Sequence, residues 1–165
     1  MDSDGYLSQL ADIFNGITVN TPSISAIIAI VLAGVLLLAS GFASASEIAF
    51  FSLSPSDRND IDERNHTSDD KISALLGNSE RLLATILITN NFVNVTIIML
   101  CNFFFMNVFV FHSPLAEFLI LTVILTFLLL LFGEIMPKIY SAQKTLAFCR
   151  FSAPGIYYLE KIFYP

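Results

Sequence analysis

The sequence contains few charged residues for its length. Only 13% of its 165 residues are Asp, Glu, Lys or Arg, whereas 55% are hydrophobic and the mean hydropathy is +0.73. Soluble domains carry about 25% charged residues, so soluble enzymes, nucleic-acid-binding proteins and secreted disulfide scaffolds are excluded. Residues 13–46 and 82–116 have no charged side chain, and about 20 apolar residues cross a bilayer as a helix. We therefore expect a membrane protein whose partner is the lipid bilayer, with no nucleic acid and no enzymatic activity.

Cysteine and basic residues are also scarce. The two cysteines, Cys101 and Cys149, fall on opposite sides of the membrane in the topology derived below, so we expect no intrachain disulfide. Eight basic residues against fourteen acidic ones give a net charge of -6, which argues against a polybasic surface that binds anionic lipids. No Lys or Arg occurs in residues 1–23, so we predict no cleavable signal peptide and a retained N-terminus.

Three long apolar segments predict three transmembrane helices. The first runs from about residue 24 to 53 after a turn-like segment in which Pro22 suits the first turn of a helix. The second runs from about residue 82 to 105, and the third from about 118 to 137. The sequence therefore predicts an all-α membrane protein with three transmembrane helices and an amphipathic juxtamembrane helix.

The polar segments between and after these helices complete the predicted organisation. Residues 54–81 form a long polar stretch with a short amphipathic helix near residues 72–76, which ends near Gly77. Residues 141–163 mix aromatic, aliphatic and charged side chains, which predicts an interfacial helix interrupted at Pro154 and Gly155. We accordingly divide the chain into an N-terminal segment (1–23), a three-helix transmembrane domain (24–140) and a juxtamembrane segment (141–165).

The distribution of Lys and Arg predicts the orientation of the chain. All eight basic residues lie in the 54–81 segment or after the third apolar segment, and none lies before residue 24 or between residues 106 and 117. Cytoplasmic loops are enriched in Lys and Arg. We therefore expect the N-terminus outside and the C-terminus in the cytoplasm, with 54–81 cytoplasmic.

Each predicted transmembrane helix contains polar residues, which are costly in hydrocarbon and often functional. At about 1.5 Å rise per residue, the serines of the first helix and the asparagines of the second lie at similar depths. Their donors are oxygen atoms, and no His or Cys occurs at ligand spacing in the helices, so a hard cation such as magnesium, sodium or calcium fits better than zinc or copper. The predicted metal ligands are Ser40, Ser44, Asn90, Asn94, Gly133 and Glu134.

Structural roles for these polar residues stay open at this point. Serines are common at tight helix interfaces, and an asparagine pair one turn apart can hydrogen-bond between helices. Glu134 can extend to water or pair with Lys138, and Glu47 can be solvated or salt-bridged. A role for Glu47 or Asn91 in the site is undecided. A serine hydrolase is excluded, because neither His66 nor His112 lies at the depth of the serines.

The three polar motifs together resemble the transmembrane domain of the CNNM/CorC magnesium transporter family. The motifs are residues 44–47 (Ser-Ala-Ser-Glu), residues 86–94, which end in Asn94, and the run from Gly133 to Lys138. The resemblance covers roughly residues 24–160. Ala45 and Thr89 replace glycines that are frequent in the family. The acidic N-terminus resembles the gliding-motility-associated bacterial branch more weakly.

This resemblance implies a homodimer that transports magnesium ions as its substrate. It implies efflux of dehydrated magnesium from the cytoplasm, coupled to sodium influx, and cytosolic CBS domains that bind ATP after the juxtamembrane helix. The chain ends at Pro165, directly after that helix, so ATP is expected only through CBS domains absent from this chain. The alternative is a membrane scaffold or magnesium sensor that does not transport and whose polar residues only pack the helices.

Overall fold

The computed structural model describes residues 18–64, 66–110 and 114–163. Three helical stretches are long and apolar enough to cross a membrane, namely Ile24–Phe51, Ser79–Val108 and Glu117–Gln143, which confirms the predicted all-α membrane fold. The elements in chain order are β1 (Thr18–Val19), α2 (Ile24–Phe51), α3 (Pro55–Asp62), α4 (Asp69–Leu76), α5 (Ser79–Val108), β2 (Phe109–Val110), α6 (Pro114–Leu128), the π-helix η1 (Leu129–Ile135), α7 (Met136–Gln143) and α8 (Thr145–Phe163).

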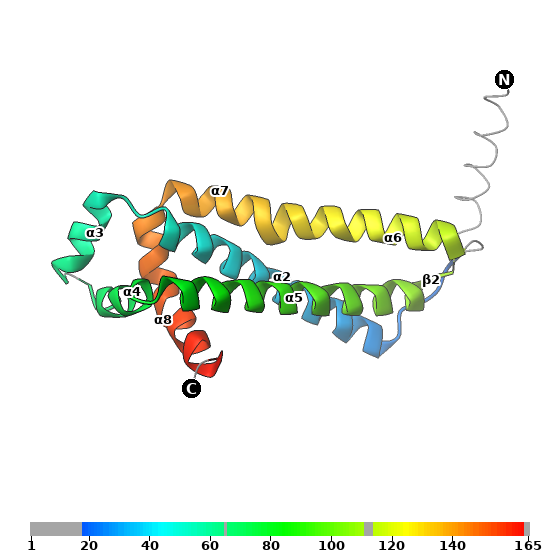
Figure 1. The fold of residues 1–165 in the computed structure, drawn as a ribbon. Coiled ribbons are helices and arrows are strands. Elements are labelled where there is room, and N and C mark those ends of the chain that lie inside the picture. The colour runs from blue at the N-terminus through cyan, green and yellow to red at the C-terminus, as the bar shows by residue number, and fades with distance from the viewer. Residues whose placement is uncertain (1–17, 65, 111–113, 164–165) are drawn as a thin grey trace, which may run out of the picture.

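Helices α2 and α5 form the centre of the fold, and the run α6–η1–α7 packs beside them (Figure 1). At one end of the bundle, β1 pairs antiparallel with β2, so that Thr18 lies opposite Val110 and Val19 opposite Phe109. This strand pair ties the start of α2 to the end of α5. Helices α3, α4 and α8 gather at the other end (Figure 1), where all eight basic residues of the chain lie in or beside α3, α4, α7, α8 and the start of α5.

The sequence suggested that the third spanning helix ends at Pro137, but the helix continues past this residue. Pro137 lies in the first turn of α7, and the helical path continues to Gln143. Proline lacks the N–H that an α-helix would use at this position. The π-helix η1 directly before it changes the backbone register, and the Met136 N–H bonds the Leu131 carbonyl five residues back. The π-helix therefore accommodates the proline without breaking the helix.

Two other helices differ from the sequence-based expectation. Helix α3 was not predicted; it begins with a reciprocal capping box between Ser54 and Asp57, and Pro55 occupies its first turn. Helix α8 was predicted to break at Pro154 and Gly155, yet it is continuous from Thr145 to Phe163. Its buried face has members on both sides of the proline, including Cys149 and Ile156. We attribute its continuity to this packing, which offsets the roughly 3 kcal/mol cost of an interior proline.

A buried ion pair joins α4 to α8. Arg150 donates from Nε to Asp69 Oδ1 at 2.8 Å and from Nη2 to Asp69 Oδ2 at 3.0 Å. The Asp69 side chain is fully buried, and its Oδ2 also accepts the His66 N–H at 2.9 Å. The hydrogen bond from Arg150 is the main reason that the pKa of Asp69 lies below its ordinary value of 3.8, against the opposing effect of burial. The pair therefore holds the two helices together while the carboxylate is ionised.

We predict that Asp69→Asn destabilises the protein by about 3 kcal/mol, because it leaves a largely buried arginine without its counter-charge. The measurement is the free energy of unfolding in detergent at pH 7. The lowered pKa sets the pH dependence: the wild-type advantage is complete above pH 3.8 and is lost as the pH falls below that value through the folded-state pKa. The two proteins should therefore converge in stability in strong acid.

The neighbouring residue supplies a matched control. Asp70 lies next to Asp69 in the first turn of α4 but pairs with Arg64 on the surface. The side chains of Asp70 and Arg64 are 71% and 72% exposed. Asp70→Asn should cost less than about 1 kcal/mol, as is usual for exposed ion pairs. Equal losses in the two variants would show that the buried pair has no special role.

Candidate metal site between three helices

Three side-chain oxygen atoms converge between α2 and α5, about midway along both helices. Ser40 Oγ lies 2.7 Å from Asn90 Oδ1 and 2.6 Å from Asn94 Oδ1. Asn90 and Asn94 are one helical turn apart, so their side chains project from one face of α5 toward α2. The depth comparison made from the sequence placed the pair Ser44 and Ser40 level with the pair Asn90 and Asn94, whereas in the structure Ser40 alone hydrogen-bonds to both asparagines.

One hydroxyl serves both asparagine oxygens in this cluster. A serine hydroxyl has a single hydrogen and can donate it to only one acceptor at a time. The other amide oxygen then faces the hydroxyl oxygen without a proton between them. Ser40 is fully buried and both asparagines are half-buried, so the cluster presents excess acceptor capacity in a spanning region. A cation would satisfy all three oxygens at once.

The third spanning helix closes this cluster from another side through Gly133. A Cβ atom at Gly133 would lie 3.2 Å from Ser40 Oγ, so the glycine backbone packs directly against the serine. Gly41, next to Ser40 on α2, makes a second close approach: a Cβ there would lie 3.0 Å from Pro137 Cγ and 3.3 Å from the Phe132 carbonyl oxygen. Small residues at both positions allow the backbones to come this close.

The backbone around Glu134 is irregular. Gly133 and Glu134 both belong to η1, and Pro137 cannot donate a hydrogen bond back to this turn. Glu134 is half-buried, and its carboxylate makes no hydrogen bond or ion pair with the residues that the structure describes. Glu134 directly follows Gly133 in the chain, and Gly133 is the residue that packs on Ser40. The distorted backbone at Gly133 therefore adjoins the oxygen cluster.

Two further hydroxyls near this level are buried without partners. Ser44 Oγ and Thr85 Oγ1 have no hydrogen-bond partner in the described part of the chain, although both side chains are fully buried. Ser44 lies one turn of α2 beyond Ser40, as the sequence-based ligand set expected. Thr85 was missed, although a hydroxyl five residues before Asn90 in an apolar helix is a signal of the same kind. Burying a hydroxyl without a hydrogen-bond partner costs free energy of folding. A polar ligand bound beside these hydroxyls would offset that cost.

The remaining candidate residues lie outside the cluster. The Glu47 carboxylate pairs with Lys138 Nζ at 3.0 Å, so Lys138 is bound to Glu47 and not to Glu134. Asn91 is exposed on another face of α5. Ser141, which was not considered as a candidate, is buried and donates to the Ala45 carbonyl at 2.6 Å, which fixes α7 against α2 beside the site.

The donor set consists of amide, hydroxyl, carboxylate and backbone oxygens. No group of three or more His, Cys, Asp or Glu side chains capable of holding a metal occurs among residues 18–64, 66–110 and 114–163. The two cysteines are free and buried, and burial raises the pKa of Cys149 in α8 to about 12. Neutral oxygen donors with one carboxylate suit a hard cation better than a transition metal.

Comparison with known proteins identifies the family of the chain. Residues 27–165 match the family described as "Cyclin M transmembrane N-terminal domain" (CNNM). The chain is also similar to the "UPF0053 protein" of Haemophilus influenzae (strain ATCC 51907 / DSM 11121 / KW20 / Rd), with 33% identity over 129 residues. The aligned region covers 78% of this chain but only 30% of that relative.

We predict that Gly41→Ala separates α2 from the third spanning helix. The added methyl group would lie 3.0 Å from the Pro137 ring, and overpacking of this kind typically costs 1 to 3 kcal/mol, here about 2 kcal/mol. Thermal unfolding in detergent measures the loss. The matched control is Gly34→Ala on the same helix, where nothing lies within 4 Å of the added Cβ. Equal stability of the two variants would contradict the close approach.

Proposed function

Since the chain belongs to the CNNM transmembrane-domain family, a family of membrane transporters linked to metal ions, we propose that it carries magnesium across the membrane through the site between α2, α5 and η1. The ion is the transported substrate. Ser40, Asn90 and Asn94 would supply side-chain oxygens, the backbone at Gly133 a further oxygen, and Glu134 the negative charge. Ser44 would contribute its unpartnered hydroxyl.

The observation that supports the proposal most directly is the sharing of one hydroxyl by two amide oxygens. Structural hydrogen bonding alone would be served better if one asparagine turned its amide N–H₂ group toward the serine. The side-chain orientation of Asn90 and Asn94 in the structure points oxygen and not nitrogen at Ser40. Oxygens from three side chains that face one point are what a cation requires.

The donor set favours magnesium over calcium, because it offers one carboxylate and few oxygens, whereas calcium takes about six to eight oxygen ligands. Adjacent oxygens of an octahedral shell with bonds of about 2.1 Å lie about 3.0 Å apart, whereas bonds of about 2.4 Å place them about 3.4 Å apart. The distances from Ser40 Oγ to the two amide oxygens, 2.7 and 2.6 Å, are those of hydrogen bonds, so the side chains would have to move apart to admit an ion of either size. Only a small outward shift of the side chains would admit the smaller ion.

The direction of transport is part of the same proposal. The basic residues gather at the α3–α4–α8 end, and the positive-inside rule assigns that end to the cytoplasm. Ser40 lies closer along α2 to this end, Phe51, than to Ile24. We propose export from the cytoplasm, coupled to sodium influx as the family resemblance implies, by a homodimer in a bacterial inner membrane. ATP would act only through CBS domains outside this chain.

The charge of Glu134 is the first test of the ligand set. Glu134→Gln should abolish magnesium binding, or weaken it at least tenfold, because it removes the negative charge that offsets ion dehydration while the side chain keeps its size. Binding is measured by calorimetry in detergent, and transport by magnesium flux in proteoliposomes. Glu80→Gln, at the exposed start of α5, is the control. Wild-type binding by the Glu134→Gln variant would remove Glu134 from the site.

The second test separates a magnesium ligand from a helix-packing role for Asn94, which is the alternative scaffold function. If Asn94 is a ligand, Asn94→Ala should remove most of the stabilisation by magnesium, about 2.7 kcal/mol when the ion is present at 100 times its Kd. Without magnesium the same variant should lose only the hydrogen bond to Ser40, about 0.6 kcal/mol. Melting curves with and without magnesium measure both effects.

Asn91→Ala is the matched control for this test, since Asn91 is exposed on the same helix. It should leave the magnesium-induced shift unchanged. A scaffold function predicts a different pattern: Asn94→Ala would lose equal stability with and without the ion. An intact magnesium-induced shift in that variant would contradict the ligand role.

A further inference from the structure

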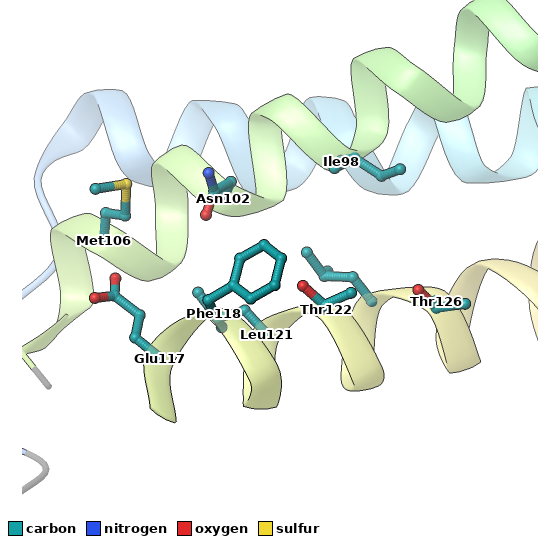
Figure 2. Close-up of a pocket in the computed structure, with 9 residues that line it drawn as sticks. Ile98, Asn102, Met106, Glu117, Phe118, Leu121, Thr122 and Thr126 are labelled. Carbon is teal, nitrogen blue, oxygen red and sulfur yellow. The ribbon is translucent and has the colours of Figure 1, made fainter. Parts of the chain in front are cut away.

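A separate cavity of about 320 Å³ lies between α5 and α6, on the β1–β2 side of the oxygen cluster (Figure 2). Its polar lining consists of Asn102 from α5 and Glu117, Thr122 and Thr126 from α6. In Figure 2 the Glu117 carboxylate extends from α6 toward α5, and Asn102 projects toward α6. The cavity therefore combines a carboxylate, an amide and two hydroxyls within the spanning part of the fold.

The polar residues of this cavity lie farther along the helix that carries Asn90 and Asn94. On α5, Asn90, Asn94, Ile98 and Asn102 follow one another at intervals of four residues, and each interval turns by about 40°, so the side chains wind from the face toward α2 to the face toward α6. Thr122 and Thr126 on α6 are likewise one turn apart. The polar lining of the cavity thus lies about 120° around α5 from Asn90, and Ile98 separates Asn102 from Asn94 along the helix.

The side chains of the cavity are not used in packing interactions. None of the four polar side chains forms a hydrogen bond or ion pair with another described residue. The cavity is open, with Asn102, Thr122 and Thr126 exposed and Glu117 half-buried, and exposed polar groups in a spanning region are costly unless they face water or a polar partner. A water molecule in a liquid occupies about 30 Å³, so the cavity has room for about ten water molecules, enough for a hydrated ion.

An apolar layer separates this cavity from the central cluster. Leu125 lines the cavity and also belongs to a buried cluster with Val93 and Ile97, against which Leu129 packs. Ile97 lies between Asn94 and Asn102 on α5, and Leu125 and Leu129 lie between Thr122 and Gly133 on the third spanning helix. The path from the oxygen cluster to the cavity is therefore closed by hydrocarbon side chains in this conformation.

We propose that the cavity between α5 and α6 is the outer vestibule of the cation path, in which Glu117 and Asn102 receive the rehydrating ion after Leu125 and Leu129 separate. This inference rests on the proposed transport function. The carboxylate would attract the divalent cation, and the amide and hydroxyl oxygens would hydrogen-bond to its water shell. The apolar layer would then be the outer gate.

Water access to the vestibule is tested by thiol labelling of the full chain in proteoliposomes. Thr122→Cys should react with a charged, membrane-impermeant thiol reagent added on the side of the β1–β2 end. The control is Val123→Cys, one residue further on α6. The Val123 side chain is 66% exposed on the molecular surface but, unlike Thr122, does not line the cavity. Val123→Cys should react at least tenfold more slowly, because thiolate formation needs water. The unsubstituted chain, with buried cysteines, gives the background.

The role of the vestibule in transport is tested by magnesium flux in the same vesicles. The labelled Thr122→Cys variant should transport no magnesium, whereas the same variant should transport magnesium before labelling. Glu117→Gln should lower flux at limiting magnesium roughly tenfold through lost electrostatic attraction, while the magnesium-induced thermal shift of the central site is retained. Glu80→Gln, the same substitution in the first turn of α5 at the opposite end, should have no effect.

The outcomes distinguish failure of the vestibule from failure of the transport function. Equal labelling of the two cysteine variants, or no labelling of Thr122→Cys because lipid or a second copy of the chain fills the cavity, would overturn the vestibule alone. Flux that persists after complete labelling would also overturn it. Absence of magnesium flux from the unsubstituted chain would overturn the proposed transport function and the path with it.

Discussion

Pro137 has no N–H to donate, and the structure of the third spanning helix around the site depends on this missing hydrogen bond. In a regular α-helix that N–H would bond to the carbonyl of Gly133. The backbone instead forms the π-helix η1 immediately before the proline. One consequence is that the Phe132 carbonyl and the Pro137 ring pack against Gly41. A second is that the backbone at Gly133 packs on Ser40.

The end of the bundle that carries the basic residues supports this geometry from a distance. The Asp69–Arg150 pair fixes α8 to α4, and the buried face of α8 joins an apolar cluster that also contains Phe50 of α2 and Ile86 of α5. Gly155 of α8 packs closely on the Phe42 ring, only two residues from Ser40. Helix α8 thus forms a continuous brace against both helices that carry the site, and the uninterrupted path through Pro154 is needed for that contact.

The sequence was sufficient to predict part of the candidate site. Ser40, Asn90 and Asn94 were grouped by helical spacing and depth, because the rise of a helix is fixed and the ends of an apolar segment set its position in the membrane. Spacing could not show that both amide oxygens face one hydroxyl, since amide orientation depends on the neighbours of each side chain. It also could not assign the partner of Lys138, because the carboxylates of Glu47 and Glu134 were both candidates. In the structure the partner is Glu47.

Local properties of the sequence determined the membrane class, the number of spanning helices and the grouping of basic residues at one end. These properties are hydropathy and the distribution of charge. Tertiary structure alone decided the features that depend on contacts between distant segments. These include the β1–β2 pair, the burial of Asp69 against Arg150, and the continuity of the helices through Pro137 and Pro154. Local rules predict a break at a proline, whereas packing from other helices supplies the free energy that keeps the chain helical.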